Sequence, residues 1–122
     1  MPLDFDVSQR QYELAWSVSQ AIQWPVLEIR QTRTYASWFA GLRDRDAKVR
    51  IDIRIRRLSL GNPGDVRPVG EGVSALRVDH GPGYRVYFTR GGNEYVLAGG
   101  SKASQDRDIR QAGALARELQ ES

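Results

Sequence analysis

A glycine-rich connection formed by Gly99, Gly100, Ser101 and Lys102 leads from a predicted strand into a predicted helix and could bind an anion. A helix N-terminus presents free backbone N–H groups, and the lysine adds a positive charge beside them. The spacing of the glycines is not that of a P-loop. A flexible connection with an exposed lysine explains the same residues, so this segment indicates a phosphate site only together with neighbouring cations.

Two arginines and a tyrosine on neighbouring predicted strands could supply those groups. Side chains alternate along a strand, so Arg77 points away from the core if its neighbour Leu76 points into it. By the same alternation Arg85 and Tyr87 point outward from the next strand. We therefore expect an open sheet face with two cations and an aromatic ring beside Lys102, which are the groups that RNA phosphates and unstacked bases require.

Cleavage of RNA through its 2′-hydroxyl needs a proton acceptor, positive charge at the phosphate and a proton donor, and it needs no metal or cofactor. Arginine and lysine supply the charge. The residues that could move protons are Lys102, Tyr84, Tyr87, Asp108 and His80. The histidine lies in a Gly-Pro turn, where a solvated turn residue is the expected role, and we place it outside the site.

The positive charge of the chain is concentrated in residues 43–57. The whole chain has a net charge of +3, but this segment has seven basic and three acidic residues. Arginine dominates, and its planar fork suits bidentate phosphate contacts, so nucleic acid is the leading partner class. We predict that Arg50, Arg54 and Arg57 bind RNA. The alternative is a solvated helix face with many ion pairs.

Three carboxylates in this segment raise the question of a metal ion: Asp44, Asp46 and Asp52. The first two are two residues apart and would diverge on a helix, so helix capping is their predicted role and no metal site is expected. The chain has no Cys, which excludes a disulfide framework and every cysteine-based metal site and suits a reducing compartment. The acidic N-terminus does not resemble a secretory signal, and no apolar run is long enough to span a membrane, so we expect a soluble, cytoplasmic protein.

The 122 residues suit one compact domain, preceded by an extension. Apolar residues recur at helical spacing in four segments: 9–23, 35–42, 47–58 and the residues after Ser104. Runs rich in β-branched residues predict four strands: Val66–Val69, Ala75–Val78, Tyr84–Thr89 and Tyr95–Ala98. A further short strand is predicted around Val26 to Ile29. We expect an α+β fold in which a helical hairpin packs on a small antiparallel sheet with a C-terminal helix.

Three sequence motifs within about residues 26–116 together resemble one family. They are GNPGDVRPVGEGVSALR, GPGYRVYF and GG-x-K-x-x-Q-x-x-DI. The chain resembles toxins of the RelE/ParE superfamily, and within it the HigB-like, phage-derived addiction-module killer proteins. The resemblance implies a RelE-like toxin domain over residues 25–122. Residues 1–24 precede the usual start of the family, and we expect them to form an N-terminal helical extension.

The resemblance also implies an activity and partners. Such toxins cut mRNA on the ribosome and are neutralised by a cognate antitoxin, often a helix-turn-helix protein of the HigA-like kind. By position, Arg77 and Lys102 match the phosphate-binding catalytic cations of the family, and Arg85 and Tyr87 match its strand motif. Asp108 stands where some RelE toxins carry a tyrosine that transfers a proton, so the acid and base are left open.

Two functions of different class fit this resemblance. The first is a ribosome-dependent mRNA endonuclease that acts in the cytoplasm, with no membrane partner. The second is a ParE-like inhibitor that binds DNA gyrase without catalysis, since one scaffold hosts both. A gyrase binder would not need Arg77, Arg85 and Lys102 on one face. The sequence therefore favours the endonuclease.

Overall fold

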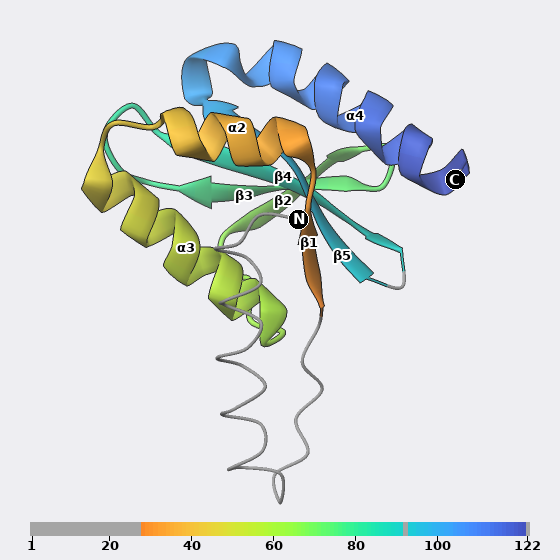
Figure 1. Cartoon of the computed structure of the whole chain (residues 1–122), viewed down its shortest axis with the longest axis horizontal. Coiled ribbons are helices and arrows are strands. Elements are labelled where there is room, and N and C mark those ends of the chain that lie inside the picture. The colour runs from red at the N-terminus through yellow and green to blue at the C-terminus, as the bar shows by residue number, and fades with distance from the viewer. Residues whose placement is uncertain (1–27, 92, 122) are drawn as a thin grey trace, which may run out of the picture.

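The computed structural model describes residues 28–91 and 93–121 (Figure 1). The predicted helix over residues 9–23 and the predicted extension over residues 1–24 lie outside the described residues. The described part is an α+β fold, as the sequence predicts. Within it, no helix is long and apolar enough to cross a membrane.

Two helices follow the first strand, and side-chain caps define where they begin. Helix α2 (Arg33–Gly41) begins after Thr32, whose Oγ1 accepts a hydrogen bond from the backbone N–H of Tyr35. Helix α3 (Arg45–Ser59) begins after Asp44, whose Oδ1 accepts from the backbone N–H of Ala47. It ends before Gly61, which has a φ of +82°, a conformation that glycine adopts without strain. The predicted capping role of Asp44 and the predicted helix over residues 47–58 are confirmed.

The sheet has five strands in the order β1-β5-β4-β3-β2. The strands are β1 (Ile29–Gln31), β2 (Val66–Gly70), β3 (Val73–Val78), β4 (Tyr84–Gly91) and β5 (Asn93–Ser101). The four strands β2 to β5 form an antiparallel meander. The prediction of a purely antiparallel sheet is wrong, because β1 pairs with β5 in parallel. Parallel strands need a long connection between them, and the helices and strands between β1 and β5 provide one.

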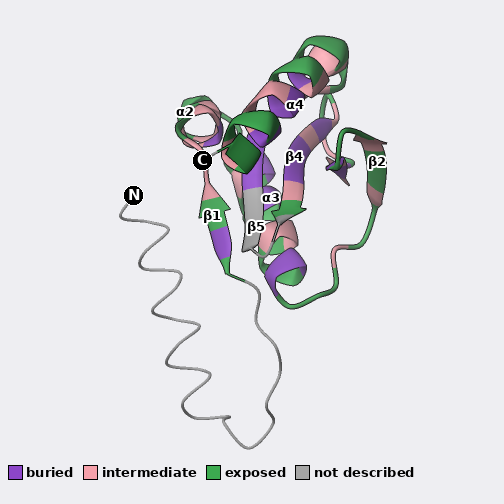
Figure 2. Cartoon of the chain, turned by 90° about the vertical axis from the view of Figure 1, so that its right-hand side faces the viewer, coloured by how far each residue is buried: buried purple, intermediate pink, exposed green. Residues whose placement is uncertain are grey.

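Helices cover both faces of the sheet. On one face α2 and α3 pack against a cluster that includes Leu76, Val78, Val86 and Phe88. On the other face the C-terminal helix α4 (Gln105–Glu121) packs through its alanines against a second cluster, which includes Ala75, Tyr87 and Ala98. Figure 2 shows buried positions on α4 and on β4 in purple.

The predicted alternation of side chains on β3 and β4 is therefore confirmed, but the prediction of an open sheet face is wrong. Helix α4 needs an apolar surface for its own stripe of small residues, and the middle of this face supplies it. Only the end of the face beyond α4 is left for polar groups.

Candidate functional site

The two predicted strand arginines lie side by side at one end of the sheet. Arg77 of β3 pairs in register with Arg85 of β4, which pairs in turn with Gly100 of β5. Residues opposite one another on antiparallel strands have Cβ atoms about 5 Å apart and share a face. The neighbouring row on this face contains Ala75, Tyr87 and Ala98 under α4. The polar row thus begins where the apolar packing of α4 ends.

Lys102 joins these arginines through the turn before β4. It begins the short 3-10 helix η1 (Lys102–Ser104), and its backbone N–H donates to the carbonyl of Gly83 at 2.8 Å. A Cβ built on Gly83 would lie 3.6 Å from Lys102 Cβ and 3.7 Å from Arg85 Nη1. The structure therefore brings Arg77, Arg85 and Lys102, here called the cation cluster, to one end of the sheet from three separate elements.

The arginines of the cation cluster already have partners in the free protein. Arg77 donates from Nε and Nη2 to Asp65 Oδ1 at 3.0 and 2.8 Å. This hydrogen bond lowers the pKa of Asp65 below its usual value. Arg85 Nη1 donates to the carbonyl of Tyr84 at 3.2 Å. Because the Arg77–Asp65 pair is partly exposed, solvent screens it and it contributes little to stability, so a phosphate can compete with the carboxylate for Arg77.

Asp108 is buried at the start of α4, with 3% of its surface exposed. Ser104 Oγ lies 2.5 Å from Asp108 Oδ2 and donates to it, and Arg107 Nε lies 3.6 Å from Oδ1. A Cβ at Gly100 would overlap this carboxylate, so glycine is required at that position. The carboxylate thus holds the turn that presents Lys102.

Tyr87 is not the exposed ring that the sequence predicts. It is fully buried under α4, and its hydroxyl has no hydrogen-bond partner among the described residues. Burial, together with the negative charge of Asp108, raises the pKa of Tyr87 to about 12. The predicted position of Tyr87 on an open face is therefore wrong, because the alanines of α4 cover the ring.

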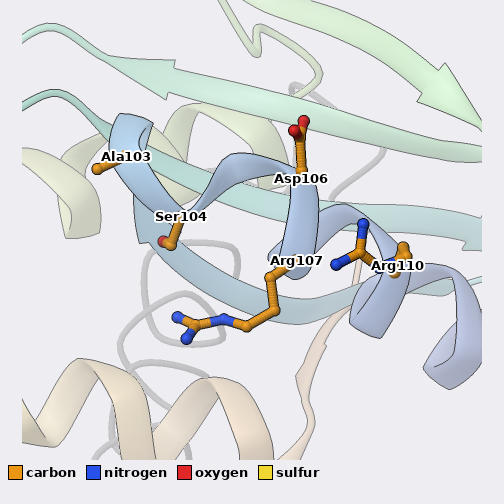
Figure 3. A pocket seen from close by; sticks show the side chains of 5 residues that line it. All are labelled: Ala103, Ser104, Asp106, Arg107 and Arg110. Carbon is orange, nitrogen blue, oxygen red and sulfur yellow. The ribbon is translucent and has the colours of Figure 1, made fainter.

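Two arginines that the sequence did not single out, Arg107 and Arg110, lie in the first turns of α4. A shallow pocket of about 340 Å³ at the start of α4 is lined by Ala103, Ser104, Asp106, Arg107 and Arg110 (Figure 3). Arg107 extends below Ser104 in this view, whereas Asp106 projects to the other side of the helix. Their spacing could have indicated this, because Arg107 and Arg110 are three residues apart and residues at positions i and i+3 of a helix lie on one face.

The three arginines predicted to bind RNA from α3 have different roles. Arg54 turns inward: its Nη1 donates to the carbonyl of Arg77 at 2.6 Å, and its Nη2 donates to the carbonyls of Pro63 and Asp65 at 2.9 and 3.2 Å. Partial burial lowers its pKa below the usual value. The guanidinium of Arg54 thus ties α3 to the loop before β2, a packing role that the sequence does not predict. Arg50 and Arg57 are exposed.

His80 is a structural contact rather than a solvated turn residue. Its Nε2 lies 3.1 Å from Asp44 Oδ2, so the turn between β3 and β4 contacts the N-terminus of α3. The backbone N–H of Ala47 lowers the pKa of Asp44, and the histidine contact adds to this effect. The histidine therefore contacts the residue that caps α3.

The fold and the cation cluster define a small α+β protein with a basic site at the end of its sheet. No family model matches the chain, and no solved structure matches it. A Haemophilus influenzae protein, described as an uncharacterized protein, is 45% identical over 95 residues, which cover 76% of this chain and 96% of that protein. The chain therefore belongs to the same family as this Haemophilus protein.

Proposed function

We propose that the protein is the toxin of a type II toxin–antitoxin system and that it cuts mRNA on the ribosome by attack of the 2′-hydroxyl. The observation that carries this proposal is the cation cluster, because three cations from distant parts of the chain meet at one end of the sheet. The order of a helical hairpin, a meander and a C-terminal helix supports a RelE-like fold. The sequence motifs quoted above support the same family.

The proposed chemistry is electrostatic stabilisation of the phosphate in the transition state. Arg77, Arg85 and Lys102 would bind the phosphate oxygens, where negative charge increases as the 2′-oxygen attacks. Lys102 is exposed and can approach a bound strand. Asp108 and Tyr87 are buried, so in this proposal they position the turn and strand that carry the cations.

The proposed partners follow from this activity. They are the ribosome, its mRNA and a cognate antitoxin, of the helix-turn-helix, HigA-like kind. Arg50 and Arg57 on the exposed side of α3 would add phosphate contacts outside the reacting centre. The proposed location is the cytoplasm, where these partners occur.

One observation favours a second function, the inhibition of DNA gyrase without catalysis. Three of the residues that the sequence offers for proton transfer are buried: Tyr84, Tyr87 and Asp108. A protein that only binds gyrase needs no accessible acid or base. The two functions are separated by whether ribosome-bound mRNA is cut.

The experiment compares wild-type protein with Arg85→Ala and Lys102→Ala variants in cleavage of a reporter mRNA on purified ribosomes. Loss of one preorganised charge contact lowers such a rate by about 10²-fold. Arg33→Ala is the matched control, because this exposed arginine lies on α2, which covers the opposite face of the sheet. Equal cleavage by all four proteins would refute the proposed site, and absence of cleavage by the wild type would favour gyrase.

A further inference from the structure

Helix α4 crosses its face of the sheet diagonally and leaves one corner uncovered. Near the start of the helix, Asp108 lies against Gly100 of β5. Near its end, Arg117 Nη1 donates to the two carboxylate oxygens of Glu71 at 2.7 and 2.6 Å, and Glu71 lies in the turn between β2 and β3. The start of β2 and the end of β3 therefore lie beside the path of the helix rather than under it.

Three charged residues line this uncovered corner. Arg67 of β2 pairs in register with Ala75 of β3, so its side chain lies on the face of the sheet that α4 packs against. Arg77 follows two residues after Ala75 and lies on the same face. Its backbone N–H donates to the carbonyl of Asp65 at 2.9 Å, which holds Asp65 beside the end of β3. Both Asp65 and Arg67 are exposed. We call Asp65, Arg67 and Arg77 the corner site.

The carboxylate of Asp65 lies where an external anion could bind. Its hydrogen bond from Arg77 is the main cause of its lowered pKa, and the positive charges of Arg77, Arg54 and Arg67 lower this pKa further. Arg54 is committed to backbone carbonyls. The guanidinium of Arg67, in contrast, has no hydrogen-bond or ion-pair partner among the described residues. The corner site thus has two cations for one carboxylate and attracts a further anion.

We propose that the corner site binds a phosphate of a single-stranded RNA, next to the phosphate that the cation cluster binds. A phosphate oxygen replaces the Asp65 carboxylate on Arg77, and Arg67 contacts the same phosphate. Arginine binds carboxylate and phosphate through the same planar fork, so this exchange needs no change in the strand that carries Arg77. Asp65 is half-exposed, so water can solvate the displaced carboxylate. The choice of RNA as the ligand rests on the proposed function.

Arg77 connects the corner site to the cation cluster. Arg85 lies opposite Arg77 on β4, whereas Arg67 lies on its other side, on the edge strand β2. Neighbouring strands are about 4.8 Å apart and two residues along a strand span about 7 Å, so the Cα atoms of Arg85 and Arg67 are about 12 Å apart. The cations therefore extend across the end of the sheet, as contact with successive phosphates of one strand requires.

The test measures binding of a short single-stranded 2′-O-methyl RNA, which has no free 2′-hydroxyl to attack, by fluorescence anisotropy at several salt concentrations. For Arg67→Gln we expect weaker binding and a slope of log K against log salt concentration that is smaller by about 0.7, the value for one lost phosphate contact. Asp65→Asn should bind more tightly than the wild type, because it removes the competing carboxylate. Circular dichroism checks that each variant is folded.

Arg33→Gln is the matched control. It makes the same change of charge at an exposed residue of α2, which covers the opposite face of the sheet, and it should keep the slope of the wild type. Equal slopes for Arg67→Gln and Arg33→Gln would overturn the proposal and leave Arg67 as a counter-charge of Asp65. Equal or weaker binding by Asp65→Asn would also overturn it, because the carboxylate would then not compete with the RNA.

Two further arms separate this proposal from its alternatives. Inorganic phosphate, at the phosphate concentration of the RNA, should not compete, because a free ion cannot contact Arg67 and Arg85 together. Competition would assign the corner site to the free ion and overturn the proposal. If Arg85→Gln weakens binding and Arg67→Gln does not, the corner site alone is refuted. If Arg67→Gln has the expected effect but wild-type protein leaves mRNA uncut on ribosomes, the proposed cleavage alone is refuted.

Discussion

Replacing Tyr87 with phenylalanine tests whether the structure assigns this side chain correctly. The hydroxyl is buried under α4 with no hydrogen-bond partner among the described residues, and the ring packs in the second cluster. Tyr87→Phe removes one oxygen and keeps the ring. The structure therefore predicts a protein that is at least as stable as the wild type.

The expected change in the free energy of unfolding follows from the burial of a hydroxyl that has no hydrogen-bond partner among the described residues. Burying a polar group without a partner costs about 1–3 kcal/mol, and the lost packing of the oxygen offsets part of the gain. We expect the free energy of unfolding to rise by about 1 kcal/mol, or the Tm by roughly 4 °C. The pKa of about 12 means that the hydroxyl is protonated at neutral pH, so ionisation contributes nothing to this difference.

The assay is urea unfolding followed by circular dichroism, with cleavage of ribosome-bound mRNA measured in parallel. Tyr35→Phe is the control, because its hydroxyl is also buried and unpartnered in the described structure but belongs to the cluster on the other face. Both variants should gain stability and keep full cleavage. A loss of more than about 1 kcal/mol in Tyr87→Phe would show that the hydroxyl has a partner. A 10²-fold loss of cleavage in a stable Tyr87→Phe protein, of the size expected for a catalytic proton donor, would show that the hydroxyl reaches the RNA.

Three further predictions concern the packing around the site. Gly100→Ala should destabilise the fold by about 2 kcal/mol or more in urea, because its Cβ overlaps the buried Asp108 carboxylate and something must shift. Arg54→Ala should cost about 2 kcal/mol in the same assay, since its guanidinium donates to three carbonyls, whereas Arg50→Ala should stay within about 0.5 kcal/mol. The folded-state pKa of Asp65 is lowered, so its stabilising effect is present above about pH 4 and is lost as pH falls through the folded pKa. Asp65→Asn should therefore show a flatter fall in stability than the wild type between about pH 5 and pH 2.

Helices and strands could be predicted where the sequence shows both the spacing of apolar residues and the residues that begin and end the element. The apolar spacing over residues 47–58 indicates helix α3, and Asp44 at its start and Gly61 after its end agree with this spacing. The faces of β3 and β4 followed from strict alternation, so Arg77 and Arg85 were correctly placed on one face.

The errors arose where a residue's environment comes from a distant segment. The apolar stripe of α4 is visible in the sequence, but nothing local indicates which surface it covers, so the burial of Tyr87 cannot be predicted from its own strand. The contacts of Arg54 reach carbonyls 9 to 23 residues away, and no periodicity encodes them. The direction of β1 depends on how the chain crosses the sheet, which its three residues do not specify.

The most direct test of the central claim is a toeprint of an mRNA on ribosomes with purified protein, run beside a gyrase supercoiling assay. The proposed role of the cation cluster predicts new mRNA 5′ ends that depend on the ribosome and disappear in a folded Arg77→Ala, Lys102→Ala double variant. Gyrase should supercoil DNA normally in the presence of the protein. Uncut mRNA together with inhibited gyrase, or full cleavage by the double variant, would contradict the claim.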